Sequence, residues 1–296
     1  ILNNYRTIFL ILLMMLLAFV GHNASLSDGY VFRFPQEILS IGGGTAKQLT
    51  ELHNAEWRKY RCFLEESQTF ADFQACPTPK DLNKPSLVLW GDSHAASLYP
   101  GYVAIYGHQY NIVQRTAALC PPILEFVKQD RPNCKKLNDD LFAWIAITKP
   151  HKVVLAAWWG VYDWQMVYAT ISKLKQAGVI QVDLVGPLPQ WSEHLPNIVM
   201  KVFKADLLHQ MPNYLNRGLK TLDFVPLDGQ MAAIAQRQGI TYISPRQYLC
   251  SEAGCLAVLV TSEALSPVKT YSFTAFDLAH LTSAASRYLV GQFPSN

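Results

Sequence analysis

Short apolar segments that alternate with helix-like stretches place the strongest constraint on the fold of this chain. The segments SLVLW, from Ser86, and KVVLAA, from Lys152, are apolar at nearly every position rather than at alternate positions. Such continuous runs are typical of strands that are covered on both faces. Strands of this kind, separated by helices, predict a parallel sheet between two layers of helices.

The other predicted elements follow the same alternation. We expect strands at 86–90, 111–115, 152–157, 180–185 and 240–244, and helices near 95–106, 137–147, 162–177, 228–238 and 282–291. Residues 191–227 form a longer, less regular insertion. The predicted fold class is therefore α/β, a three-layer α/β/α sandwich with a mostly parallel central sheet. Ligands in such sheets collect at the carboxyl ends of the strands, where we expect the functional site.

The N-terminal region contains an unbroken apolar run, Ile8–Val20, preceded by Arg6 and followed by no Lys or Arg until Arg33. This pattern predicts a membrane helix over residues 1–21, alone or as the last of several, with the bulk of the chain outside the cytoplasm. A signal peptide and a buried core helix are the alternatives, although no clear small-x-small cleavage site follows directly. We expect residues 22–85 to be a periplasmic linker or extension, and residues 86–296 to be the catalytic domain.

Six cysteines fall into three local groups, and sequential pairing is the simplest expectation: Cys62–Cys76, Cys120–Cys134 and Cys250–Cys255. Behind an export-type segment, an even number of cysteines indicates disulfides in an oxidising compartment, with buried free thiols as the alternative. Half of the 296 residues are apolar, which excludes a disordered chain. A net charge of +3 without any basic run gives no indication of nucleic-acid binding.

The sequence VLWGDSH ends the first predicted strand and begins a helix. Gly91 permits a sharp turn, and Ser93 would lie at a helix N-terminus, where free N–H groups favour negative charge. This position suits a nucleophilic serine and an oxyanion beside it. The alternative is that Asp92 or Ser93 only caps the helix.

A second motif, DLAH, stands before the last predicted helix, with Asp277 and His280 three residues apart. This spacing allows the carboxylate to hold one imidazole nitrogen while the other faces a serine, which predicts a base and its orienting group. A metal site formed by Asp92, His94, Asp277 and His280 is the less economical alternative, so we expect no metal and no cofactor.

Together, the GDSH and DLAH motifs resemble the SGNH, or GDSL-type, hydrolases, and the likeness covers roughly residues 86–291. The resemblance implies that Ser93 is the nucleophile, His280 the base and Asp277 its orienting group. The stretches GDSHAASLYPG, CPP, VVLAAWW and DLAHLTSAAS are similar to the SGNH domain at the C-terminus of bacterial membrane acyltransferases of the acyltransferase-three type. Those proteins O-acetylate surface or envelope glycans.

The chain departs from that family pattern at the oxyanion donors. Family members typically supply a Gly after the second strand and an Asn after the third, whereas this chain has Thr-Ala-Ala at 116–118 and no Asn after the third strand. We therefore expect the backbone N–H groups of Ser93 and Ala117 to act as the oxyanion donors, with an unidentified side chain as the alternative. Loss of one good donor typically costs about 10²–10³ in rate, so weak hydrolysis and preferred transfer are expected.

Several side chains near these motifs have two possible roles. Asp92 and His94 could support the site, or could be a helix cap and a packed imidazole. Aromatic rings suit sugars, so Trp158 and Trp159 are candidate substrate contacts, with Trp164 and Trp191 nearby, but tryptophan in an apolar α/β domain is more often core.

The expected function is an O-acyltransferase that acetylates a cell-envelope glycan, such as lipopolysaccharide O-antigen, another surface polysaccharide or peptidoglycan, through an acyl-serine. The expected partners are the glycan acceptor and a membrane acyltransferase module in the same full-length chain, which delivers the acyl donor. We expect the protein in the inner membrane, with this domain facing the periplasm or cell exterior. An exported carbohydrate or lipid esterase and a glycan-binding adaptor with a vestigial triad are the alternatives.

Overall fold

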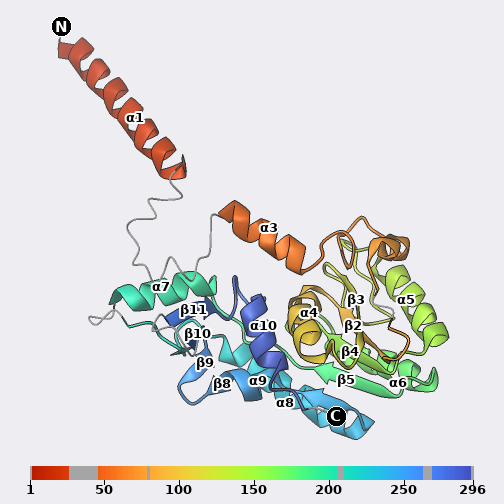
Figure 1. The fold of residues 1–296 in the computed structure, drawn as a ribbon. Coiled ribbons are helices and arrows are strands. Elements are labelled where there is room, and N and C mark those ends of the chain that lie inside the picture. Colours follow the sequence, from red (N-terminus) through yellow and green to blue (C-terminus); the bar gives the residue numbers. More distant parts are fainter. Residues whose placement is uncertain (1, 27–45, 79–80, 206–209, 263–268, 295–296) are drawn as a thin grey trace. The chain divides into compact units, whose positions relative to one another are not determined.

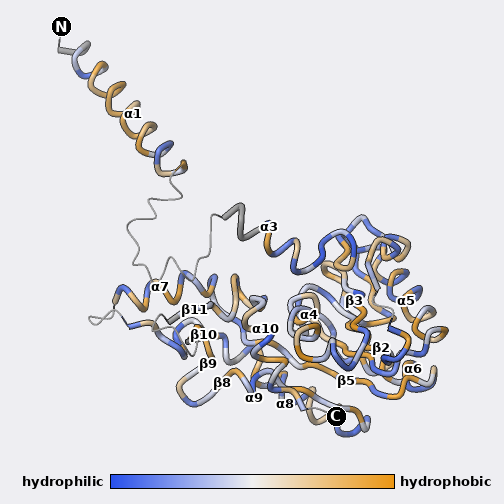
Figure 2. The backbone as a smooth tube through the Cα atoms, viewed as in Figure 1, coloured by the Kyte–Doolittle hydropathy of each residue, from blue (hydrophilic) through white to orange (hydrophobic). Residues whose placement is uncertain are grey.

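The computed structural model describes residues 2–26, 46–78, 81–205, 210–262 and 269–294, and divides into two units, residues 1–52 and 53–296 (Figure 1). The first unit contains helix α1 (Leu2–Leu26), which is apolar along most of its length (Figure 2). Its segment Tyr5–Leu26 has a mean hydropathy of 2.1 and is long and apolar enough to cross a membrane, a test that signal sequences also pass. Helix α3 (Ala46–Glu56) begins in the first unit and ends in the second.

A six-stranded sheet in the order β1-β3-β2-β4-β5-β7 forms the centre of the second unit, and all its strand pairs are parallel. The strands are β1 (Phe63–Leu64), β2 (Ser86–Gly91), β3 (Asn111–Ala117), β4 (Lys152–Ala156), β5 (Gln181–Val185) and β7 (Thr241–Ile243). The predicted α/β class is confirmed. Gly91, at the end of β2, is paired with Thr116 of β3 and Ala156 of β4, so the ends of three strands meet there.

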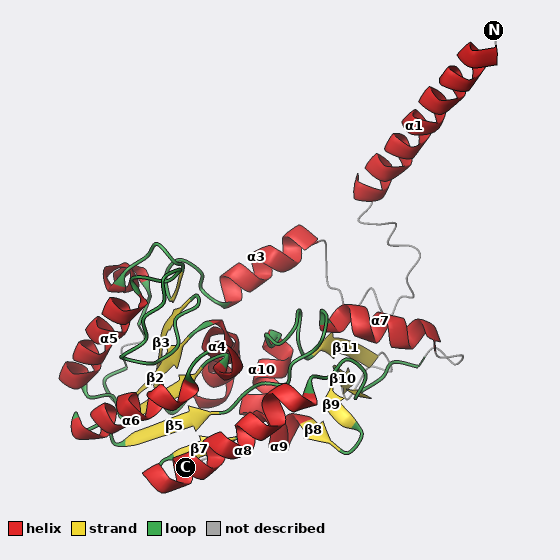
Figure 3. Cartoon of the chain, turned by 180° about the vertical axis from the view of Figure 1, so that it is seen from behind, coloured by secondary structure: helices red, strands yellow, loops and turns green. Residues whose placement is uncertain are grey.

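Helices cover both faces of this sheet, which explains the continuously apolar strands. They are α4 (Ser93–Tyr106), α5 (Cys134–Thr148), α6 (Val167–Gln176), α8 (Thr221–Gln238), α9 (Pro245–Leu249) and α10 (Ser283–Val290). Leu87 and Leu89 of β2 pack in one core with α4, α9 and α10. Val88 and Trp90 point to the other face of the sheet and pack in a second core with α5, α6 and α8. Figure 3 shows these three helices.

The insertion 191–227 packs with residues 250–275 to form a smaller, separate core. This core includes α7 (Leu195–Ala205) and two short antiparallel sheets, β6-β9-β8 and β10-β11. Their strands are β6 (Tyr214–Leu215), β8 (Cys250–Ser251), β9 (Gly254–Leu256), β10 (Val258–Ser262) and β11 (Lys269–Phe273). Trp191, Leu195 and Phe224 are buried within this core.

Some boundaries differ from the sequence-based expectations. Helix α8 begins at Thr221 rather than Asp228 and includes Pro226, which in sequence indicates a helix boundary. The helix predicted at 162–177 begins only at Val167, as α6. Two short 3-10 turns, η3 (Trp159–Val161) and η4 (Trp164–Met166), precede it. The 3-10 helix η2 (Phe70–Ala75) and strand β1 were not predicted.

Candidate active site

The turn that carries Ser93 joins β2 to α4 and has no room for a side chain at Gly91. A Cβ at Gly91 would lie 1.7 Å from the carbonyl oxygen of Ala156 and 2.9 Å from the Cβ of Ala95. Glycine is therefore required so that β2 and α4 can approach β4 this closely. Ser93 follows as the first residue of α4, where backbone N–H groups have no acceptor within the helix.

Asp92 fixes this turn to the loop after β4. Its buried carboxylate accepts hydrogen bonds from the N–H of His94 (2.8 Å), the N–H of Trp158 (2.9 Å) and the hydroxyl of Tyr162 (2.9 Å). Burial raises the pKa of Asp92, although these three donors oppose the shift. Burial, together with the charge of Asp92, raises the pKa of Tyr162 far above its usual value, so the phenol remains a donor.

Ser93, His280 and Asp277 lie in hydrogen-bonding contact. The Nε2 atom of His280 is 2.8 Å from the Ser93 Oγ, and its Nδ1 atom is 2.6 Å from an oxygen of Asp277. The other Asp277 oxygen accepts the N–H groups of Ala279 (3.0 Å) and His280 (2.9 Å). Burial alone would raise the pKa of Asp277, but these bonds and the charge of His280 lower it to about 2. A charged carboxylate thus holds Nδ1, and Nε2 is placed to accept the serine proton.

Close packing of α10 on α4 brings the two distant motifs together. The N–H of Gly101 in α4 donates to the Ser286 hydroxyl in α10 (2.9 Å), and a Cβ at Gly101 would lie 2.3 Å from the Ser286 carbonyl oxygen. The insertion holds the other side of the His–Asp segment. The backbone N–H of Trp191 donates to the Leu278 carbonyl (2.8 Å), and the backbone N–H of Leu195 donates to the Asp277 carbonyl (3.0 Å).

Three aromatic rings surround the His280 imidazole: Trp57 at 5.2 Å, His94 at 4.9 Å and Phe276 at 5.7 Å between ring centroids. Trp57 follows α3 and was missed from the sequence, where no spacing or motif marks it. His94 also stacks on Trp158, at 5.4 Å, and neither of its ring nitrogens has a hydrogen-bond partner among the described residues. Burial, with a smaller effect of His280, lowers the pKa of His94 well below its usual value, so this imidazole is neutral.

The backbone N–H of Ala117 is part of the central sheet. The N–H groups of Thr116 and Ala118 donate to the carbonyls of Cys62 (3.1 Å) and Leu64 (2.8 Å), on the β1 side. Because successive N–H groups of a strand point to opposite sides, that of Ala117 points toward β2, where the parallel pairing of Gly91 with Thr116 directs it at the Gly91 carbonyl. The expected oxyanion donor Ala117 is therefore engaged in the β2–β3 ladder.

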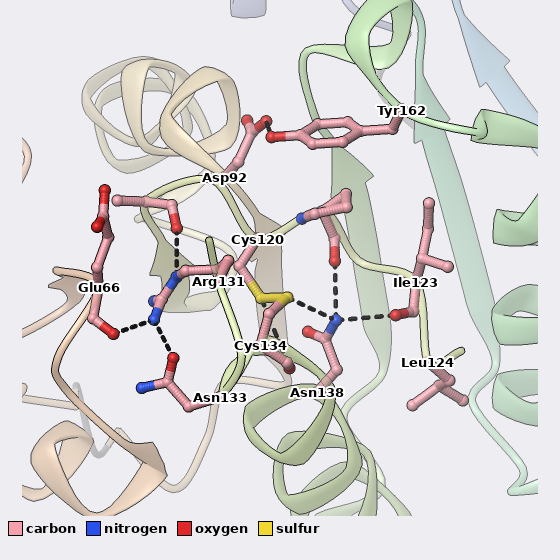
Figure 4. Close-up of a disulfide and its surroundings, with 12 residues drawn as sticks. Glu66, Asp92, Cys120, Ile123, Leu124, Arg131, Asn133, Cys134, Asn138 and Tyr162 are labelled. Carbon is pink, nitrogen blue, oxygen red and sulfur yellow. Dashed lines mark hydrogen bonds between the residues drawn. A yellow bond between two sulfur atoms is a disulfide. The ribbon is translucent and has the colours of Figure 1, made fainter. Parts of the chain in front are cut away.

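The loop after β3 is braced by buried polar groups and a disulfide (Figure 4). Arg131, which is fully buried, donates to the carbonyl of Ala118 (2.8 Å) and to that of Glu66. Asn138 donates to the carbonyls of Pro121 and Ile123. These contacts hold the segment that follows Ala117 in one position.

Disulfides join all three cysteine pairs in the structure: Cys62–Cys76, Cys120–Cys134 and Cys250–Cys255. The first connects the residue before β1 to the end of η2, and the second connects the loop after β3 to the start of α5. Both therefore lie along the β3 side of the site.

The tryptophans near the strand ends are mainly core residues. Trp159 is fully buried, and its Nε1 donates to the carbonyl of Val185 (2.7 Å), so it is not placed to contact a sugar. Trp164 and Trp191 are also buried. Trp158 is half-buried beside His94, which makes it the only one of these four with a partly exposed side chain at the site.

A parallel α/β/α sandwich with a serine after β2 and a histidine and an aspartate in the loop before α10 defines an enzyme of the SGNH hydrolase type. Among the residues that the structure describes, no cluster of three or more His, Cys, Asp or Glu could hold a metal ion. The chain belongs to the family of the SGNH domain (fused to AT3 domains), whose model matches residues 61–295.

Solved structures extend this comparison. The periplasmic domain of a lipopolysaccharide acetyltransferase from Salmonella ser. Paratyphi A is similar at a TM-score of 0.70 and 25% identity, over 86% of this chain and 97% of that one. A putative acylhydrolase from Bacteroides fragilis is more distant, at a TM-score of 0.42 and 14% identity, over 76% of this chain and 92% of that one. No curated protein sequence gives a significant match.

Proposed function

We propose that this protein is an O-acyltransferase that moves an acetyl group onto a hydroxyl of a cell-envelope glycan. The observation that carries the proposal is the contact of Ser93 with His280, at 2.8 Å, in a chain whose fold is similar to a lipopolysaccharide acetyltransferase domain. Acceptors of this class include lipopolysaccharide O-antigen, other surface polysaccharides and peptidoglycan.

The proposed reaction has two displacements at one serine. In the first, Nε2 of His280 takes the Ser93 proton while Oγ attacks the acetyl carbonyl, and the donor leaves with that proton. In the second, His280 takes a proton from the glycan hydroxyl, whose oxygen attacks the acyl-serine carbonyl. His280 returns the proton to the Ser93 Oγ as the acyl–oxygen bond breaks, which regenerates Ser93. Asp277 stabilises the imidazolium in both steps. The N–H group of Ser93, at the N-terminus of α4, is the proposed oxyanion donor.

The family and helix α1 support a proposal for the location and the partners of the protein. The family is fused to AT3 domains, which supports delivery of the acetyl group by a membrane acyltransferase module of the same full-length protein. We propose that α1 anchors the chain in the inner membrane and that the second unit faces the periplasm. The catalytic part is proposed to include residues from His53 onward, beyond the expected 86–296, because Trp57 contacts the His280 ring.

Acceptor competition tests this proposal. The purified chain is given a radiolabelled activated acetyl ester with and without envelope glycan, and label is followed on serine, on glycan and as free acetate. We expect label on the glycan, and a loss of at least about 10³-fold in Ser93→Ala. Ser97→Ala is the matched control, because Ser97 lies one turn along α4 and bonds only the His94 carbonyl (2.8 Å). Label that appears only as acetate would favour the esterase, and an unchanged Ser93→Ala variant would exclude both enzymes.

A further inference from the structure

A surface cavity of about 550 Å³ lies between η2 and α5, with Arg115 of β3 in its lining. The residues of this cavity that matter here are Phe70, Phe73, Arg115, Lys136, Asp140 and Trp144. None of them belongs to the site described above. Arg115 lies two residues before Ala117, the last residue of β3, which places the cavity about 7 Å along the strand from the end that faces the site.

Arg115 is a buried cation without a carboxylate partner. Only 7% of its surface is exposed, and it forms no ion pair with any described residue. Its hydrogen bonds go to the Gln114 carbonyl (2.9 Å) and the Thr78 hydroxyl (3.4 Å), and its Nε has no partner among the described residues. A guanidinium offers five N–H donors, so this group is far from saturated. Buried charges are normally paired or hydrogen-bonded at their donors, so a buried guanidinium with donors left over can take an anion.

A second guanidinium near Arg115 increases the excess of positive charge. Arg58 donates to the Tyr99 hydroxyl (2.7 Å) and the Pro77 carbonyl (2.8 Å), with no carboxylate partner among the described residues. Burial, together with the charge of Arg58, lowers the pKa of Arg115 to about 10, so Arg115 stays protonated at neutral pH. An anion on Arg115 would relieve this repulsion.

The only carboxylate among the cavity-lining residues is already paired. Both oxygens of Asp140 accept hydrogen bonds from Lys136, at 2.8 Å each, on the exposed rim. Asp140 is therefore satisfied by Lys136, and Arg115 is left with aromatic faces but no carboxylate partner among the described residues.

Aromatic rings supply the rest of the cavity wall. The Arg115 guanidinium lies 5.0 Å from the Phe73 ring centroid and 5.1 Å from that of Trp144, and Phe70 packs against Phe73 at 5.9 Å. A flat, apolar wall beside an unpaired cation fits a ligand with a ring and a negative charge. Sugar rings present C–H faces that pack on aromatic side chains, and a carboxylate or phosphate can bind a guanidinium through two oxygens.

We propose that this cavity binds a negatively charged sugar residue of the acceptor glycan, with its anionic group on Arg115 and its ring against Trp144. The inference rests on the glycan acceptor proposed above, but it concerns binding and not transfer. A second contact of this kind would select acidic glycans over neutral ones.

Calorimetry on the full chain in detergent tests the inference with three probes: methyl glucuronide, glucose 6-phosphate and methyl glucoside. We expect one or both anionic sugars to bind, and the neutral glucoside to bind at least tenfold more weakly. Glucuronide alone would assign a carboxylated sugar, and glucose 6-phosphate alone a phosphorylated one. Equal binding of the neutral glucoside, or full displacement by an equal concentration of acetate, would overturn the proposal.

Variants assign the binding to this cavity. Arg115→Gln is expected to weaken the anionic sugar at least tenfold, and Arg246→Gln, at a different cavity, to leave it unchanged. Should Arg115→Gln fail to fold, Trp144→Ala replaces it, with the same expected loss, because Trp144 is half-buried on α5. Unchanged affinity in the folded variant would refute the site. Ser93→Ala should bind the sugar normally, so failure of binding and failure of transfer are separate results.

Discussion

The two halves of the candidate triad are held in different ways. The nucleophile turn is built into the sheet: Gly91 is too crowded for a Cβ, and the buried Asp92 carboxylate accepts three hydrogen bonds. The His–Asp segment lies outside the sheet, and about a fifth of each of its two side chains is exposed. It is held by one isolated bridge, Ala275 with Leu281, and by backbone contacts with the insertion.

Because of this difference, changes in the nucleophile turn should mainly affect stability, and changes in the His–Asp segment should mainly affect catalysis. Changes in the turn disturb the packing of β2, β4 and α4, so they should lower the free energy of unfolding. Changes in the His–Asp segment remove charge and orientation in a partly exposed segment outside the sheet, so they should lower the rate and leave the fold intact.

The largest effect is expected for Asp277→Asn. A neutral amide would not stabilise the imidazolium, and with its oxygen on the N–H groups of Ala279 and His280 its NH2 would face Nδ1 and favour the wrong tautomer, so kcat for acetyl transfer should fall about 10⁴-fold. The loss of stability should be smaller than that of Gly91→Ala, because the segment is partly exposed. Because its pKa is about 2, the Asp277 carboxylate stays charged above roughly pH 3 and should not limit activity at mildly acidic pH. Asp163→Asn, at an exposed position, is the control. A large loss of stability in Asp277→Asn would contradict the comparison.

Gly91→Ala should give the complementary result. Its Cβ would lie 1.7 Å from the Ala156 carbonyl oxygen, so we expect a loss of about 3 kcal/mol or more in the free energy of unfolding, or no folded protein. Gly160→Ala, in the loop after β4, is a matched control because its nearest neighbours would be 3.7 Å away. Chemical denaturation measures both, and equal stabilities for the two variants would refute the argument for a crowded turn.

The smallest effect concerns His94, which joins the two halves by packing on His280. Burial lowers its pKa in the folded chain, whereas the unfolded chain binds a proton there near pH 6.5. Stability should therefore fall as the pH falls below about 6.5, by at most about 1.4 kcal/mol per pH unit from this group.

His94→Phe should reduce that pH dependence, since Phe has no proton to bind and neither ring nitrogen of His94 has a described partner. Urea denaturation at neutral and mildly acidic pH measures the effect, with exposed His108→Gln as the control. An identical pH dependence in wild type and His94→Phe would show that His94 is not the group responsible.

The sequence predicts those features that local patterns determine. Continuous apolar runs mark β2 and β4, and GDSH and DLAH mark both halves of the triad, because a turn and a short spacing suffice to define them. The sequence could not reveal β1, with two residues, or Trp57, whose contact with His280 depends on the tertiary fold. Nor could the sequence show that Trp159 is buried and Trp158 partly exposed, because adjacent residues of the same type differ only in the side to which they turn.

Strand β1 has a further consequence for handling the protein. Its two residues pair with Thr116 and Ala117 and cover the carboxyl end of β3. A shortened protein that begins at Ser86 would present that end as a bare edge, with Cys76 and its partner both removed. Uncovered edges recruit strands from other molecules, so such a truncation invites aggregation, and a well-behaved fragment has to keep the chain from His53 onward.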